Sequence, residues 1–183
     1  GLNFYNKMIK EKALLLKSGD MGNEKVEKES VFKISVGGEA LIPEDFMENQ
    51  DDRLFFYRRL SLSTDCKEVD LVNFEIRDRF GLPPTSLRLL FLIKKIRLLS
   101  LNMNLLFLKT NNTGVDLLFG LFNKEDVVGL VTQASSFFNN HGVVFSVQNN
   151  STGLTFKIET HGVEKSLSSV VGLLNFLKDE NED

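Results

Sequence analysis

Two carboxylates, Glu75 and Asp78, are the residues whose type and spacing come closest to a chemical site in this chain. They lie three residues apart in a segment with helical periodicity, and residues with this spacing are neighbours on a helix surface. Such a pair can bind basic groups through charge-assisted hydrogen bonds. The side chains around the pair decide whether those basic groups belong to this chain or to a partner.

Other reactive side chains are few and scattered. Cys66 lies in the first turn of the predicted helix, where the helix dipole can lower a thiol pKa, but no histidine or second cysteine is near it in sequence. One cysteine and two histidines cannot supply the four ligands of a structural zinc site. His141 and His161 each precede a glycine near a predicted strand end, so we interpret them as polar loop residues. The chain also has no G-x-x-x-x-G-K-[ST] phosphate loop. We therefore expect no catalytic activity, no metal and no cofactor.

The helix that carries both carboxylates should begin at a cap formed by Thr64 or Asp65 and end at Phe80, where Gly81 can take a left-handed conformation. At about 100° per residue, its core stripe consists of Val69, Val72, Ile76 and Phe80. Its opposite face consists of Leu71, Phe74, Glu75 and Asp78. A lone amphipathic helix should present only polar groups on that side. The two large apolar side chains there need an explanation.

Two interpretations of this face stay open. In the first, another element of the same domain buries Leu71 and Phe74, and the carboxylates pair with nearby arginines such as Arg58, Arg77 or Arg79. Structural ion pairs of this kind are common and contribute little when exposed. In the second, the face docks onto a partner that offers basic residues around an apolar spot.

The length suits one domain, or one domain with an attached arm, and the composition is that of a folded protein. The chain has 183 residues, of which 42% are hydrophobic and 26% charged, values typical of a globular protein. A formal net charge of -3 gives no global basic field for nucleic acid or an anionic membrane. A single cysteine fits a reducing cytoplasm. Because the chain begins with Gly and no signal segment follows, we expect a cytoplasmic fragment of a longer protein.

Residues 87–108 imitate a membrane span, but basic side chains interrupt them. Each would cost about 2.5–3.5 kcal/mol at a bilayer centre. These residues are Arg88, Lys94, Lys95 and Arg97. We therefore expect a buried helix followed by a strand, and no membrane partner. The same four residues give an alternative function, a nucleic-acid-binding module, although the stacking aromatics of such sites are not interleaved with them.

The remaining elements follow from periodicity and turn residues. A helix is predicted over 2–18, a linker over 19–30, a strand over 31–36 and a helix over 51–62, whose inward residues should be Leu54, Phe55, Tyr57 and Leu60. A further helix starts near Pro84. Two hairpins, over 105–119 and 143–158, are each followed by a helix, over 124–138 and 163–178. This pattern predicts an α+β fold in which helices pack on antiparallel β-hairpins, after an N-terminal helical part.

Four sequence blocks, in order, resemble the C-terminal region of bacterial transcription-repair coupling factors. Residues 75–84 read EIRDRFGLPP, similar to that family's E-L-x-D-R-F-G followed by x-L-P, although the Leu82-Pro83 order departs from it. Residues 40–46 read ALIPEDF, and residues 56–61 read FYRRLS, which resemble A-x-I-P-x-D-Y and L-Y-x-R-L. Residues 1–5, GLNFY, with Met8 and Ile9, resemble the end of the preceding helicase module. Residues 102–183 carry no such motif.

The resemblance implies a function that the residues alone do not. The family's proteins are ATP-driven DNA translocases that release RNA polymerase stalled at a lesion and recruit the repair protein UvrA. Their C-terminal domain covers the UvrA-binding surface of the N-terminal module. The acids of the family's E-x-x-D motif correspond to Glu75 and Asp78, and Leu71 and Phe74 flank them.

The resemblance also implies a division of the chain and a set of partners. Residues 1–30 would be an arm and linker from the helicase module, and residues 31–183 a regulatory domain. Its direct partner would be the N-terminal UvrA-binding module of the same protein, with UvrA and RNA polymerase as indirect partners. We expect no direct nucleic-acid binding by this domain.

Overall fold

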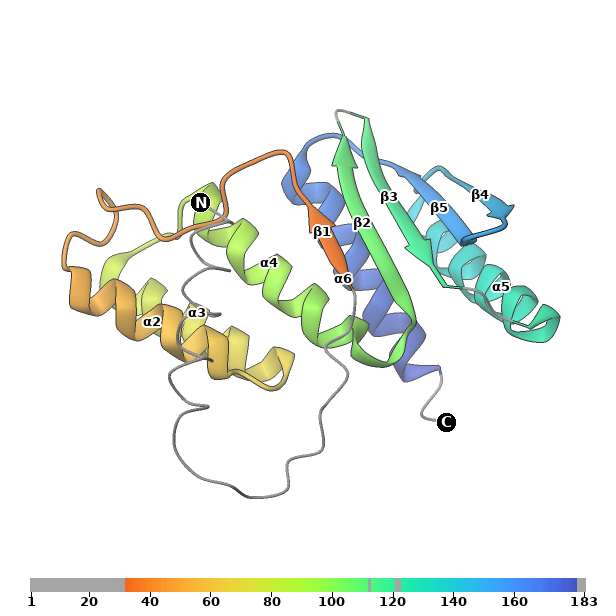
Figure 1. The fold of residues 1–183 in the computed structure, drawn as a ribbon. Coiled ribbons are helices and arrows are strands. Elements are labelled where there is room, and N and C mark those ends of the chain that lie inside the picture. Colours follow the sequence, from red (N-terminus) through yellow and green to blue (C-terminus); the bar gives the residue numbers. More distant parts are fainter. Residues whose placement is uncertain (1–31, 112, 121–122, 181–183) are drawn as a thin grey trace, which may run out of the picture.

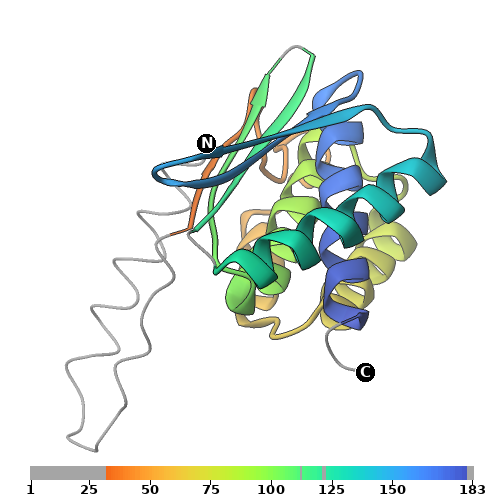
Figure 2. The same cartoon turned by 90° about the vertical axis from the view of Figure 1, so that its right-hand side faces the viewer.

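The computed structural model describes residues 32–111, 113–120 and 123–180, which form an α+β fold with a five-stranded sheet (Figure 1). The strands are β1 (Lys33–Ser35), β2 (Leu105–Asn111), β3 (Gly114–Phe119), β4 (Phe145–Asn150) and β5 (Gly153–Glu159). The helices are α2 (Gln50–Leu62), α3 (Cys66–Phe80), α4 (Thr85–Leu99), α5 (Lys124–His141) and α6 (Val163–Asp179), with a 3-10 turn η1 (Ser100–Asn102) after α4. The helices lie on one side of the sheet (Figure 2). The predicted helix over 2–18, the linker over 19–30 and the start of the first strand lie outside the described residues.

Two antiparallel hairpins dominate the sheet, whose strand order is β1-β2-β3-β5-β4. The predicted hairpin–helix units are confirmed: β2 and β3 precede α5, and β4 and β5 precede α6. The sheet differs from the prediction at one edge, because β1 pairs with β2 in parallel, with Ile34 opposite Leu108. Three helices separate these two strands in sequence, which is enough chain for the crossover that parallel pairing requires. The sheet is therefore mixed rather than purely antiparallel.

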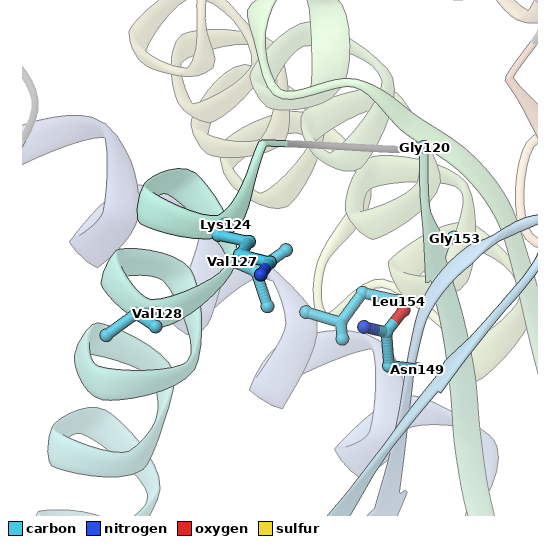
Figure 3. A pocket seen from close by; sticks show the side chains of 7 residues that line it. All are labelled: Gly120, Lys124, Val127, Val128, Asn149, Gly153 and Leu154. Carbon is cyan, nitrogen blue, oxygen red and sulfur yellow. The ribbon is translucent and has the colours of Figure 1, made fainter.

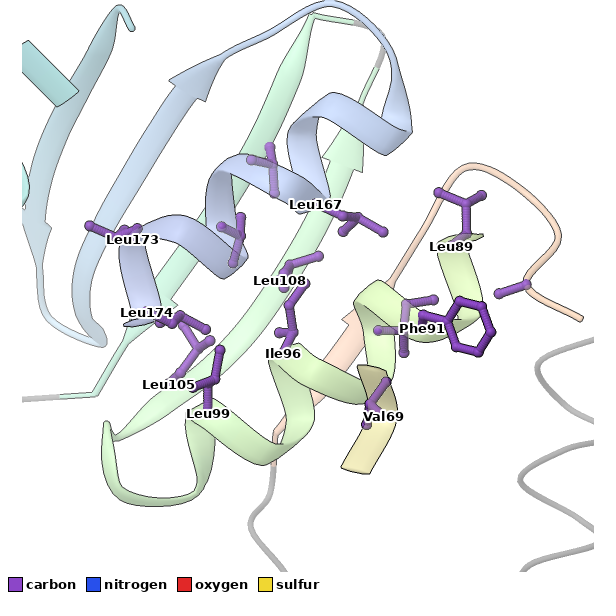
Figure 4. Close-up of a cluster of buried hydrophobic side chains, with 14 of the residues drawn as sticks. Val69, Leu89, Phe91, Ile96, Leu99, Leu105, Leu108, Leu167, Leu173 and Leu174 are labelled. Carbon is purple, nitrogen blue, oxygen red and sulfur yellow. The ribbon is translucent and has the colours of Figure 1, made fainter. Parts of the chain in front are cut away.

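The core lies between the sheet and the helices. Alternate strand residues point to one face, so Leu108, Leu117 and Phe156 are completely buried on the helix side. They belong to one cluster with Leu167 and Leu174 of α6 (Figure 4). At the far hairpin, α5 covers β4. The result is a single continuous core under both hairpins.

Helix α4 is buried on most sides, as the apolar composition of residues 87–108 predicts. Its buried residues are Leu87, Leu89, Leu90, Phe91, Ile93, Ile96 and Leu99. It packs against α3 on one side and α6 on the other (Figure 1). A helix with partners on both sides needs apolar residues nearly all round.

The predicted inward face of helix α2 is confirmed for Leu60, which is buried, and for Tyr57, which packs against the core, but it was wrong for Leu54 and Phe55. Phe56 is completely buried, whereas Phe55 is 47% exposed and Leu54 39% exposed. Adjacent helical residues point about 100° apart, so only one phenylalanine of the pair can face the core. The ring of Phe80 lies 5.9 Å from that of Phe56 in an edge-to-face arrangement, and this contact fixes which one is inside.

The two neighbouring phenylalanines therefore provide a matched test of the packing. Phe56→Ala should lower the free energy of unfolding by about 3–5 kcal/mol, because it leaves a cavity in the core. Phe55→Ala removes a half-exposed ring and should cost less than about 1 kcal/mol. Urea unfolding of the three proteins measures both values. Similar costs for the two variants would contradict the assignment of Phe56 as the core residue.

Candidate functional site

The start of α3 is fixed by a reciprocal cap. The Asp65 carboxylate accepts the Glu68 backbone N–H at 2.9 Å, and the Glu68 carboxylate accepts the Thr64 backbone N–H at 2.6 Å. The first bond satisfies a donor that a helix start leaves free, and the second ties the residue before the cap to the first turn. Of the two predicted cap residues, Asp65 is the one that caps the helix. The cap fixes where the helix begins, and burial of Val69, Val72 and Ile76 decides which side chains point outward.

The end of α3 depends on a glycine. Gly81 has φ 91° and ψ −163°, a region that essentially only glycine occupies. The positive φ agrees with the expected role of Gly81, but ψ differs from the left-handed helical value we anticipated. The chain then turns through Pro83 and Pro84 into α4, which begins at Thr85. This turn positions α3 relative to α4.

The outer face of α3 consists of Leu71, Phe74, Glu75 and Asp78, and it faces solvent. Leu71 is 63% exposed and Phe74 is 71% exposed. Ile76, on the opposite side of the helix, is completely buried. No element within residues 32–111, 113–120 and 123–180 buries the two apolar side chains of this face. Within the described residues, the first interpretation is therefore not met for the apolar half of the face.

The carboxylate of Glu75 is held by arginines of this chain. It pairs with Arg59 of α2 and, at 3.6 Å, with Arg79 one turn further along α3. Arg79 also pairs with Asp52 of α2 at 3.1 Å. This network ties α2 to α3 and fixes the orientation of the Glu75 side chain. For Glu75, the interpretation as an internal ion pair therefore holds, with Arg59 as a partner that the sequence did not indicate.

Asp78 is in a different position. It is exposed, and its carboxylate has no hydrogen-bond or ion-pair partner in the described part of the chain. Because it lies one turn from Glu75 and Phe74, an incoming cation could reach Asp78 while an apolar group covers the ring. The outer face of α3 thus combines one engaged carboxylate, one available carboxylate and two exposed apolar side chains.

The exposed surface continues onto α2, which the sequence did not predict. The Arg59 guanidinium that pairs with Glu75 also lies 5.6 Å from the centre of the Phe55 ring. This cation–π contact leaves much of the Phe55 ring in solvent. The signal in the sequence was the Phe55-Phe56 pair, since one of two adjacent rings on a helix must point away from the core. Phe55 therefore extends the apolar part of the surface.

The four basic residues of α4 do not form a free patch. Arg88 makes a two-pronged contact with Glu164 of α6 at 2.7 and 3.0 Å. Lys95 pairs with Asp70 of α3 at 2.6 Å. Lys94 donates to the Ser61 carbonyl at 3.1 Å. Three of the four therefore fasten α4 to neighbouring segments rather than offering charge to a nucleic acid.

Two of these basic residues have shifted pKa values, Arg88 through its contact and Lys94 through burial. The hydrogen bonds from Arg88 lower the pKa of Glu164 and raise that of Arg88, because each bond favours the charged form. Burial lowers the pKa of Lys94, with a smaller contribution from Arg97 in the same direction. Neither shift lies beside the outer face of α3.

The remaining polar residues that the structure describes show no reactive arrangement. Burial raises the pKa of the Cys66 thiol, the opposite of what a nucleophile needs. The Nδ1 atom of His141 lies 2.7 Å from the Phe137 carbonyl, so the imidazole is engaged in its own helix. Among the described residues, no three His, Cys, Asp or Glu side chains are grouped as a metal site would require.

A hollow between the start of α5 and the second hairpin has a volume of about 370 Å³ (Figure 3). Lys124 and Val127 of α5 face Leu154 and Asn149 across it. Its walls offer apolar groups, one ammonium and one amide, with no carboxylate or nucleophile. This lining does not make a catalytic pocket. Separately, none of the helices in the described residues is long and apolar enough to cross a bilayer.

Comparison with known proteins places these features in a family context. The sequence model of the TRCF domain matches residues 36–130. Proteins named transcription-repair-coupling factor are similar to this chain in Buchnera aphidicola (29% identity over 112 residues, 61% of this chain and 14% of that protein), Rickettsia typhi (28% over 142 residues, 76% and 12%) and Escherichia coli K12 (25% over 114 residues, 62% and 10%). The chain thus spans only 10–14% of the length of these relatives.

A solved structure agrees with the fold. The crystal structure of a C-terminal domain of transcription-repair coupling factor superposes with a TM-score of 0.69, over 87% of this chain and 100% of that one, at 11% identity. At this identity the likeness shows the fold alone. Coverage of 87% of the chain extends the match beyond residue 130.

The contact between Arg88 and Glu164 generates a pH-dependent prediction. Because the folded-state pKa of Glu164 is lowered, its contribution to stability is present above the ordinary value of 4.5 and is lost as pH falls through the lowered value. Glu164→Gln should therefore destabilise the chain above pH 4.5 and match the unaltered protein in more acidic solution. Since both side chains are about two-fifths exposed, the difference should not exceed about 1 kcal/mol.

Urea unfolding between pH 3 and 7 measures this effect. Glu180→Gln, a change at an exposed carboxylate just beyond α6, is the matched control and should follow the unaltered protein throughout. A destabilisation by Glu164→Gln that is the same at every pH would show that the charge of Glu164 is not what Arg88 binds.

Proposed function

The chain belongs to the TRCF domain family, and on this premise we propose that it is the non-catalytic, autoinhibitory C-terminal domain of a transcription-repair coupling factor. In this proposal the domain covers the UvrA-binding surface of the N-terminal module of the same protein. The cover is released when the full-length protein that contains this domain (the parent) engages RNA polymerase stalled at a DNA lesion. UvrA and the polymerase are then indirect partners, and the parent acts in the cytoplasm.

The observation that carries the proposal is the outer face of α3. Leu71 and Phe74 project into solvent beside the available carboxylate of Asp78. Exposed phenylalanine and leucine next to a free acid suit a partner surface with arginines around an apolar spot. A charge-assisted hydrogen bond to Asp78 would orient such a partner, and burial of the two apolar side chains would add affinity.

The rigidity of the surface supports the same function. Glu75 is held between Arg59 and Arg79, and Arg79 also lies 5.0 Å from the centre of the Phe80 ring. A surface that is already ordered loses little conformational entropy when it docks. Glu75 therefore acts first by positioning the face, and a partner arginine would share its carboxylate with Arg59 and Arg79.

The absence of catalysis is also part of the proposal. The matched region is the TRCF domain, not a helicase motif. The described residues contain no grouped metal ligands. In the proposal, residues 1–30 connect this domain to the helicase module. The helicase module is the part that hydrolyses ATP. The alternative of a nucleic-acid-binding module has less support, because Arg88, Lys94 and Lys95 bind within their own domain.

Charge reversal in the full-length parent tests the proposal. Asp78→Arg alone, and together with Glu75→Arg, should unmask the UvrA site. Loss of one charge-assisted contact of about 1.5–3 kcal/mol should raise the apparent affinity for UvrA at least about tenfold. Titration of labelled UvrA with each purified protein measures the change.

The single variant is the cleaner arm, because Asp78 has no internal ion pair to lose, whereas Glu75→Arg also breaks the contact with Arg59. The matched control for the double variant is Asp179→Arg with Glu180→Arg, and for the single variant Glu180→Arg alone; each makes the same charge change at the end of α6 and should leave UvrA binding unaltered. If Asp78→Arg binds UvrA as weakly as the unaltered parent does, the outer face of α3 is not the mask.

A further inference from the structure

Strand β4 forms a free edge of the sheet. Its only neighbour among the described residues is β5. The carbonyl of Val144 accepts the Glu159 backbone N–H at 2.9 Å, and in an antiparallel pair the backbone groups alternate between the two sides of a strand. The N–H and C=O groups of Phe145, Val147 and Asn149 therefore point away from β5. No other strand of the described residues pairs with this row of donors and acceptors.

This edge lacks the features that usually protect a free strand. Natural edges carry charged side chains, proline or a bulge, or they are very short. Residues 142–156 contain no charged residue, although 26% of the chain is charged. The register of β4 with β5 runs without a bulge from Phe145 to Asn150. The opposite edge, β1, is only three residues long and includes the exposed Lys33.

The side chains of β4 are also incompletely covered. The ring of Phe145 packs at a tilt on that of Phe138 of α5 at 4.7 Å and stacks on that of Phe156 of β5 at 6.3 Å. Phe145 is nevertheless only half-buried, as is Val147. Val144, at the entry to the strand, is 62% exposed. The core thus continues to the edge of the sheet, where α5 covers β4 only in part and no further strand of the described residues adjoins it.

We propose that β4 is the interface of a homodimer, in which β4 of a second copy pairs antiparallel with it about a two-fold axis near Val147. In this arrangement Phe145 of each copy lies opposite Asn149 of the other, and Ser146 lies opposite Gln148. No like charges meet, and the small apolar edge is covered from both sides. The two sheets become one continuous sheet.

A second copy fits this edge better than a charged partner does. A charged strand would find no counter-ion between residues 142 and 156, whereas an isologous pair needs none. A six-residue strand offers an interface below the standard size, so the dimer should be in concentration-dependent exchange with monomer. The interface is independent of the masking function, because β4 and α3 lie at opposite ends of the molecule (Figure 1).

The test is the mass of the chain in solution. Sedimentation equilibrium of the unaltered chain over a range of concentrations should show a mass that rises toward that of two copies. Val147→Pro removes an outward N–H without removing a bond to β5, and it should leave a monomer. Val147→Thr keeps that N–H and has a side chain of similar shape, so this variant should still dimerise. Circular dichroism confirms that both variants are folded.

A second pair of variants leaves the core untouched. Gln148 is exposed on the open face of the sheet, and near the two-fold axis it approaches its counterpart in the other copy. Gln148→Lys alone and Gln148→Glu alone should each weaken the dimer, and mixing the two should restore it through opposite charges. This arm decides the question if Val147→Pro does not fold.

Three results would overturn the proposal. The unaltered chain could stay monomeric up to several hundred micromolar. Val147→Pro, folded, could dimerise as the unaltered chain does. The mixture of Gln148→Lys and Gln148→Glu could associate no better than either variant alone. None of these results bears on the masking of UvrA, which has its own variants.

Discussion

The burial of α4 on both sides is the constraint on which the other surfaces depend. Seven of its fifteen residues are buried, and they join the helical pair α2–α3 to the sheet through α6. Its basic residues reach outward from this position and fasten the neighbours: Lys95 holds α3 through Asp70, and Arg88 holds α6 through Glu164. Basic residues that look like a nucleic-acid-binding patch in the sequence therefore join α4 to α3 and α6 in the structure.

Because α4 lies in the middle, the two exposed surfaces face different directions. The outer face of α3 lies at one end of the molecule, and the β4 edge lies at the other. The two surfaces differ in chemistry. The outer face of α3 has an acid beside large apolar side chains, whereas the β4 edge offers backbone groups without charged side chains. A single small domain can therefore meet two partners without competition between them.

The elements could be predicted from the sequence, because periodicity and turn residues are local properties. The core stripe of α3, the Asp65 cap and both hairpins follow from such signals. What the sequence could not settle was set by contacts between distant residues. The parallel pairing of β1 depends on Leu108, more than seventy residues away, and the outward position of Phe55 depends on Phe80. The pairing of Glu75 with Arg59 likewise requires the packing of two helices.

The apolar character of α4 also has a consequence for synthesis of the chain. Its cover on the α6 side is about eighty residues further along the sequence. At roughly 5–20 residues per second, translation leaves this leucine-rich helix without that cover for roughly 4–16 s. During that interval the segment that most resembles a membrane span is available to chaperones and to other nascent chains. The stable centre of the finished domain is thus its most vulnerable part on the ribosome.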